Sequence, residues 1–166
     1  MKFEIFEMDL SGDKTKIYSV IVDNDTDTLY EKFVSENITT HRKEVNNIDD
    51  RLMNIGNECG LMEEFFDTKA GKFGENLCTF KDRPGSKLRL FFIEYGNVAI
   101  ILGSGGVKSK TSKTTQDEPQ LIKENRLLGK ISITLQEAEK VGHFKINEDG
   151  SIMSTTNYAY NTEDYE

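Results

Sequence analysis

Two apolar segments joined by a short polar turn form the clearest pattern along the chain. Residues 87–93 and 98–103 are rich in Leu, Phe, Ile and Val, and Tyr95-Gly96-Asn97 lies between them. Glycine and asparagine tolerate the positive φ angles of tight turns, so this pattern predicts an antiparallel hairpin. Because side chains alternate along a strand, the first segment has two distinct faces. One face carries Leu88, Leu90 and Phe92, and the other carries Lys87, Arg89, Phe91 and Ile93.

Alternating and helical patterns predict the remaining elements. Further strands are expected at 2–10, 15–23 and 77–80 and, as a last hairpin, within 144–154. Residues 25–28 offer caps for a short helix, and Thr39 or Thr40 can cap a longer one. A third apolar stripe predicts a helix over 121–141.

Together these elements indicate an α+β protein with a central antiparallel sheet and helices packed on one face. A chain of 166 residues can bury one sizeable core, so we expect a single domain over 1–156. Residues 157–166 are acidic and are expected to form a flexible tail. In the sheet, the apolar face of the 87–95 strand is expected to pack against the helix at 121–141, through Leu88, Leu90 and Phe92.

Charge is distributed unevenly along the sequence. The net charge is −8, which by itself disfavours binding to a phosphate backbone. Residues 81–113 nevertheless hold seven cations and two anions, a local charge of +5, which leaves −13 for the rest of the chain. This segment coincides with the predicted hairpin and its flanks. The pattern therefore predicts a local site for a polyanion on an acidic protein.

Other classes of protein fit the sequence less well. No apolar run is long enough to cross a bilayer, and residues 1–9 have acids within their apolar pattern, so we expect a cytoplasmic protein without a membrane partner. Cys59 and Cys78 are expected to be reduced core thiols, and neither has metal-ligand spacing to His41 or His143. We expect no metal and no cofactor.

The order of the central elements resembles that of the RelE/HigB-like toxins of bacterial type II toxin–antitoxin systems. The likeness covers roughly residues 60–140, from a helix through a short strand, a basic turn and the hairpin to a Lys-rich loop and a final helix. The residues that carry it are Arg89 with Phe91 and Phe92, Gly96-Asn97, Leu102-Gly103, and Lys108, Lys110 and Lys113. This chain differs from those toxins in being acidic and longer, with an extra hairpin at each end.

The resemblance implies a RelE-like fold and a metal-independent endoribonuclease that acts on mRNA at the ribosome. Lys and Arg on the sheet and its loops would hold the RNA backbone. The implied partners are RNA or the ribosome and an antitoxin, often a helix-turn-helix protein.

Metal-free RNA cleavage needs a deprotonated 2′-hydroxyl, stabilisation of the phosphorane charge and protonation of the leaving oxygen. Arg89 is the candidate for charge stabilisation, because a guanidinium stays charged and can bind two phosphate oxygens. Lys87 and Lys108 complete the candidate catalytic set by positioning the backbone, and a clustered lysine with a lowered pKa would serve as base. The candidate RNA-binding residues are Arg83, Lys110 and Lys113.

Each of these features also has a plain structural interpretation. Lys87 and Arg89 alternate as on a solvated strand face, and Lys108, Lys110 and Lys113 are typical of an ordinary surface loop. Residues 103–106 read as a flexible exit from the strand, since they lack the sequence of a phosphate-binding P-loop. The alternative function is therefore a non-enzymatic protein-interaction module of the same fold, without nuclease activity.

Overall fold

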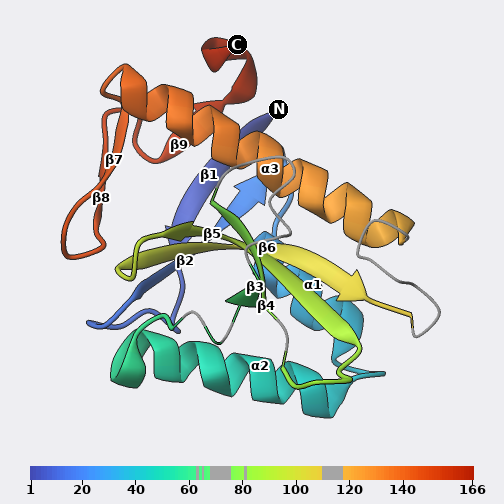
Figure 1. The fold of residues 1–166 in the computed structure, drawn as a ribbon. Helices are drawn as coiled ribbons and strands as arrows, with labels where there is room; N and C mark the ends of the chain where they lie inside the picture. The colour runs from blue at the N-terminus through green and yellow to red at the C-terminus, as the bar shows by residue number, and fades with distance from the viewer. Residues whose placement is uncertain (63, 65, 68–75, 81, 110–117) are drawn as a thin grey trace.

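The computed structural model describes residues 1–62, 64, 66–67, 76–80, 82–109 and 118–166, and it is an α+β fold (Figure 1). The strands are β1 (Lys2–Glu7), β2 (Lys16–Val22), β3 (Phe66–Asp67), β4 (Leu77–Phe80), β5 (Leu88–Tyr95), β6 (Ala99–Val107), β7 (Phe144–Ile146), β8 (Ile152–Ser154) and β9 (Ala159–Asn161). The helices are α1 (Leu29–Asn37), α2 (Arg42–Asn54), the π-helical turn η1 (Ile55–Cys59), α3 (Pro119–Lys140) and the 3₁₀ turn η5 (Thr162–Tyr165). The strands and helices predicted from periodicity are therefore present.

Seven strands form one mixed sheet in the order β3-β4-β5-β6-β2-β1-β9, while β7 and β8 form a separate hairpin. Neighbours in the large sheet are antiparallel except β2 and β6, which run parallel from the pair Lys16 and Ala99 to the pair Ser19 and Leu102. The prediction of a wholly antiparallel sheet is therefore wrong. Residues 17–20 are buried in succession, as is typical of a strand covered on both faces.

Helices cover both faces of the sheet, so the prediction that they pack on one face is also wrong. On one face α3 packs against Phe91 and Ile93 of β5. On the other face α2, together with Tyr30 and Phe33 of α1, packs in a second core cluster. The β5 residues in that second cluster are Leu88, Leu90 and Phe92. These three side chains were expected to face α3, but β5 is apolar on both faces and alternation alone does not say which helix covers which face.

A bulge interrupts the pairing of β5 with β6. Leu90 pairs with Gly105 and Phe92 with Leu102, so two residues of β6 lie opposite the single residue Phe91. A Cβ atom at Gly105 would overlap the carbonyl oxygen of Arg89, so the two backbones approach too closely for any side chain at this position. Residues 103–106 therefore belong to β6 and are buried, in contrast to the flexible strand exit predicted from sequence.

The C-terminal residues complete the sheet. The strand β9 pairs antiparallel with β1, and Tyr160 is buried against Phe3 and Phe144. The turn η5 follows directly, and Thr162 donates its backbone N–H to the Met1 carbonyl at 2.9 Å. These ordered elements differ from the flexible tail predicted for 157–166. The acidic composition of this segment suggested a tail, whereas Tyr160 is the buried residue of the strand β9.

Two further expectations concern the cysteines and the membrane. Cys78 is buried in the core as expected, but Cys59 is exposed at the end of η1, so the prediction of a core thiol there is wrong. Within the described part of the chain, no helix is both long and apolar enough to span a membrane.

Candidate nucleic-acid interface

The open end of the β5–β6 hairpin brings the three candidate catalytic residues together. The backbone N–H of Lys108 donates to the carbonyl of Lys87 at 2.6 Å, and Arg89 pairs with Gly106 two residues further along the hairpin. Lys87 is exposed, while Arg89 and Lys108 are half-buried. The hairpin was predicted from sequence, but the bulge was not, and the bulge puts Lys108 rather than Val107 opposite Lys87.

The Arg89 side chain folds back onto the loop that precedes β5. Its Nη1 donates to the carbonyl oxygens of Ser86 and Leu88, both at 2.8 Å. Among the described residues its hydrogen bonds all start from Nη1, so Nη2 and Nε keep their donor capacity for a ligand. Burial lowers the pKa of the guanidinium, and the charge of Glu44 opposes this effect. Arginine nevertheless remains charged at neutral pH.

Glu44 of α2 holds the start of β5. Its Oε1 accepts the backbone N–H groups of Lys87 at 2.7 Å and of Leu88 at 3.2 Å. The first turn of α2 is therefore fixed against the open end of the hairpin. Arg42 and Lys43 precede Glu44 in the same turn and are exposed, so they add two cations to this region.

Sequence reasoning missed Arg42 and Lys43. The expected cap at Thr39 or Thr40 is absent, since His41 occupies the N-cap position and makes no side-chain cap hydrogen bond. Cations in the first turn of a helix oppose its dipole and are unfavourable for stability. Two adjacent cations at this unfavourable position were the signal in the sequence that could have added this turn to the candidate phosphate-binding residues.

The loop between β4 and β5 is also anchored to α2. Asp82 is buried, accepts a hydrogen bond from Asn47 Nδ2 at 3.2 Å, and lies 3.4 Å from Arg51 Nε. Arg83 follows it and is exposed, while its carbonyl accepts the Ser86 N–H at 2.9 Å. This anchoring positions Arg83 in the turn that leads directly to Lys87.

These cations define what we call the open-end surface, which consists of Arg42, Lys43, Arg83, Lys87, Arg89 and Lys108. Two carboxylates are also present, Glu44 and Glu118, and each accepts backbone N–H bonds at an end of the hairpin. Lys110 and Lys113, also predicted to bind RNA, lie outside the described residues. The surface carries an excess of positive charge and can bind phosphate groups.

Neutralising Glu44 while keeping its hydrogen-bond acceptor is expected to strengthen anion binding. In Glu44→Gln the side-chain carbonyl can still accept the Lys87 and Leu88 N–H bonds, but the negative charge beside Arg89 is lost. We expect about threefold tighter binding of single-stranded RNA at low salt. Fluorescence anisotropy with a labelled oligonucleotide measures this, and Glu148→Gln, at an exposed residue between β7 and β8, is the matched control. Equal effects of both variants would contradict a local role for Glu44.

The described side chains offer no metal site at this surface. No three His, Cys, Asp or Glu side chains in the described ranges are placed to hold a metal ion. His143 lies at the far end of α3, where its Nδ1 is 2.9 Å from the Tyr165 hydroxyl. The groups described at the open-end surface are therefore its cations and the two carboxylates that bind backbone N–H groups.

Comparison of the chain with protein-family models, with curated proteins and with solved structures finds no match in any of the three.

Proposed function

We propose that this protein is a RelE/HigB-like toxin component that binds RNA through the open-end surface and cleaves mRNA at the ribosome without a metal. The observation that carries the proposal is the 2.6 Å bond between the backbones of Lys108 and Lys87, which pairs these residues two positions from Arg89 at the open end of the hairpin. The order β4, β5, β6 and α3 also agrees with the element order on which the resemblance rests.

Each cation has a definite task in this proposal. The free edge of the Arg89 guanidinium stabilises the phosphorane charge, because it offers two donors to two phosphate oxygens. One of Lys87 and Lys108, as the neutral amine, takes the 2′-hydroxyl proton, and the other, as the ammonium, holds the phosphate and gives a proton to the leaving 5′-oxygen. The contact is extended along the RNA strand by Arg83, Arg42 and Lys43. Further contacts are proposed for Lys110 and Lys113. The partner of such a toxin is an antitoxin protein.

Removing Lys87 and Lys108 together is expected to reduce both RNA affinity and its dependence on salt. The logarithm of affinity falls linearly with the logarithm of salt concentration. For single-stranded RNA, each phosphate contact adds about 0.7 to the magnitude of this slope. Lys87→Ala combined with Lys108→Ala should therefore lower the slope by about 1.4. Titration of a labelled single-stranded RNA at several salt concentrations measures this.

Lys145→Ala is the control, since Lys145 is an exposed cation on β7, at the opposite end of the fold from the end of β6 (Figure 1). It should leave the slope unchanged. If the wild-type protein binds no RNA at low salt, and its expression slows neither growth nor translation, the protein-interaction alternative replaces the toxin proposal.

A further inference from the structure

The first turns of α3 lie beside the open end of the β5–β6 hairpin (Figure 1). A Cβ atom at Gly106, near the end of β6, would lie 3.0 Å from the Gln120 side chain of the first turn. Further along the helix, a Cβ atom at Gly103 would lie 2.8 Å from the Leu128 side chain. The helix therefore begins at the open-end surface and runs back along β6.

Arg89 lies on the side of the sheet that α3 covers. Along β5 it shares a face with Phe91 and Ile93, which belong to the core cluster that contains α3. The alternate residues Leu88 and Leu90 belong to the cluster that contains α2. An RNA strand bound at Arg89 is therefore on the same side of the sheet as the start of α3.

The side of α3 that faces away from the sheet carries exposed cations, here called the α3 basic stripe, which are Lys123, Arg126 and Lys130. Their spacing of three and four residues places them on one side of the helix, opposite the buried Leu121 and Leu128. With a rise of about 1.5 Å per residue, the stripe is about 10 Å long. Residues 119–133 hold these three cations and one acid, the half-buried Glu124, although the net charge of the chain is −8.

Helix stability does not favour this arrangement. Like charges three or four residues apart on a helix repel one another, and Arg126 stands in this relation to both Lys123 and Lys130. The last turn of the same helix has the opposite arrangement, because Lys140 Nζ lies 2.8 Å from Glu137 Oε1. A bound anion offsets the repulsion between cations, so the stripe is typical of a helix face that binds phosphate.

The residue types of the stripe indicate that it contacts the RNA backbone. Lysine and arginine bind phosphates, whereas stacking on bases mostly uses aromatic side chains, and residues 119–140 contain none. Contacts to phosphates do not depend on base sequence. The α3 basic stripe therefore continues the chemistry of the open-end surface onto the helix.

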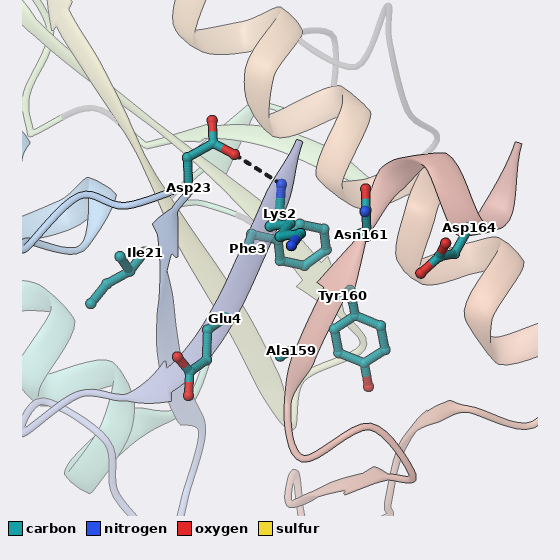
Figure 2. A pocket seen from close by; sticks show the side chains of 9 residues that line it. All are labelled: Lys2, Phe3, Glu4, Ile21, Asp23, Ala159, Tyr160, Asn161 and Asp164. Atoms are coloured by element: carbon teal, nitrogen blue, oxygen red, sulfur yellow. Dashed lines mark hydrogen bonds between the residues drawn. The ribbon is translucent and has the colours of Figure 1, made fainter.

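The opposite edge of the sheet lacks an excess of cations. A pocket of about 290 Å³ at β1 and β9 is lined by Glu4, Asp23 and Asp164 and, among the described residues, by one cation, Lys2 (Figure 2). The N-terminal ammonium donates to Thr162 Oγ1 at 3.2 Å. With three carboxylates against these two cations, this edge does not attract phosphate. The path of bound RNA is therefore expected along α3 and not across β1.

We infer that the α3 basic stripe binds backbone phosphates of RNA outside the cleaved segment. These phosphates belong either to the strand that is held at the open-end surface or to a second RNA segment. The inference rests on the proposed function for the identity of its ligand, RNA. The helix is about 10 Å across and separates the stripe from the sheet, so the stripe adds affinity without contacting the cleaved bond.

The test measures binding of labelled RNA to the full-length protein. Single strands of about four and about sixteen nucleotides separate a contact with the open-end surface alone from one that also reaches the stripe. Lys123→Ala combined with Lys130→Ala should weaken binding of the long strand about tenfold at low salt and lower the magnitude of its salt slope by about 1.4, since two phosphate contacts are lost. Binding of the short strand should change less than about twofold.

An RNA duplex of about sixteen base pairs tests the second source of phosphates, because it offers no free strand. Weakening by Lys123→Ala with Lys130→Ala that is seen for the long strand assigns the stripe to the same strand as the open-end surface. Weakening that is seen for the duplex alone assigns the stripe to a second, helical RNA segment. Either result supports the inference.

Two variant pairs serve as controls. Lys140→Ala combined with Lys145→Ala removes the same charge from the last turn of α3 and from β7, and should change affinity for the long strand less than about twofold. Lys123→Arg combined with Lys130→Arg keeps both cations and should bind within about twofold of the wild-type affinity. Alanine is the best helix former, so the alanine variants are expected to fold.

The outcomes that overturn the inference differ from those that overturn the proposed function. Equal weakening by the two alanine pairs means that RNA responds to net charge only. Unchanged binding of both the long strand and the duplex, with the short strand still bound, refutes the stripe and leaves the open-end surface. An acidic peptide whose binding is lost in Lys123→Ala with Lys130→Ala, while RNA binding is kept, assigns the stripe to a protein partner. RNA binding that depends on the stripe, without cleavage in a translating extract, contradicts the nuclease proposal alone.

Discussion

Arg89→Ala is expected to reduce RNA cleavage about a hundredfold or more, and to relieve the growth arrest that expression of an active toxin causes. The guanidinium is the one cation of the open-end surface that is both half-buried and oriented by two carbonyl bonds of 2.8 Å. A preorganised charge of this kind acts mainly on the transition state, so its loss affects the rate of cleavage more than RNA binding. Cleavage of mRNA in a translating extract measures the rate.

Two variants separate this role from general charge. Arg89→Lys keeps the cation but loses the fork that binds two oxygens, so it should recover only part of the activity. Lys87→Ala should lower affinity in a salt-dependent way and affect the rate of the bound complex less. Substitution of Arg89 removes a hydrogen-bond donor from the Ser86 and Leu88 carbonyl oxygens. Thermal unfolding must therefore show that each variant still folds. An Arg89→Ala protein that folds and cleaves at the wild-type rate would contradict the proposed site.

Gly105→Ala is expected to lower the free energy of unfolding by about 3 kcal/mol. The added methyl group would overlap the carbonyl oxygen of Arg89, and neither strand can move without breaking the pairing at the bulge. Gly106→Ala is the matched control, because its Cβ would meet the Cγ atom of the flexible Gln120 side chain at 3.0 Å, which can move. Urea denaturation of both variants measures the difference, and equal stabilities would show that the close approach at Gly105 relaxes at little cost.

The parts of the fold that could be predicted from sequence are those encoded locally. Gly96-Asn97 sets the hairpin turn through backbone conformation, and Thr28 begins α1 with the reciprocal hydrogen bonds of a capping box to Glu31. The turn and the bulge then set Lys108 opposite Lys87, whereas the register of the first four pairs, continued without the bulge, would put Val107 there. The hairpin itself could therefore be predicted from the sequence, but the bulge that sets the pairing of its open end could not.

The parts that could not be predicted depend on contacts between distant segments. Phe91 and Phe92 are both fully buried, and nothing in β5 itself says which of them meets α3. The parallel pairing of β2 with β6 likewise depends on the path of the chain between these two strands, which the local sequence of neither strand specifies. Arg42 joins the candidate site only because Glu44 binds the backbone at Lys87, a contact between α2 and β5.

The pairing of β2 with β6 and of β1 with β9 also determines when the fold can form. β1 gains its second neighbour only after β9 has been synthesised, and β2 gains its second neighbour only after β6 has been synthesised. Contacts between such distant positions slow folding, because the entropy of closing a long loop is lost before the contacts form. We therefore expect the N-terminal hairpin to leave the ribosome with both edges unpaired. Synthesis of β9 is then the step that completes the order of the sheet.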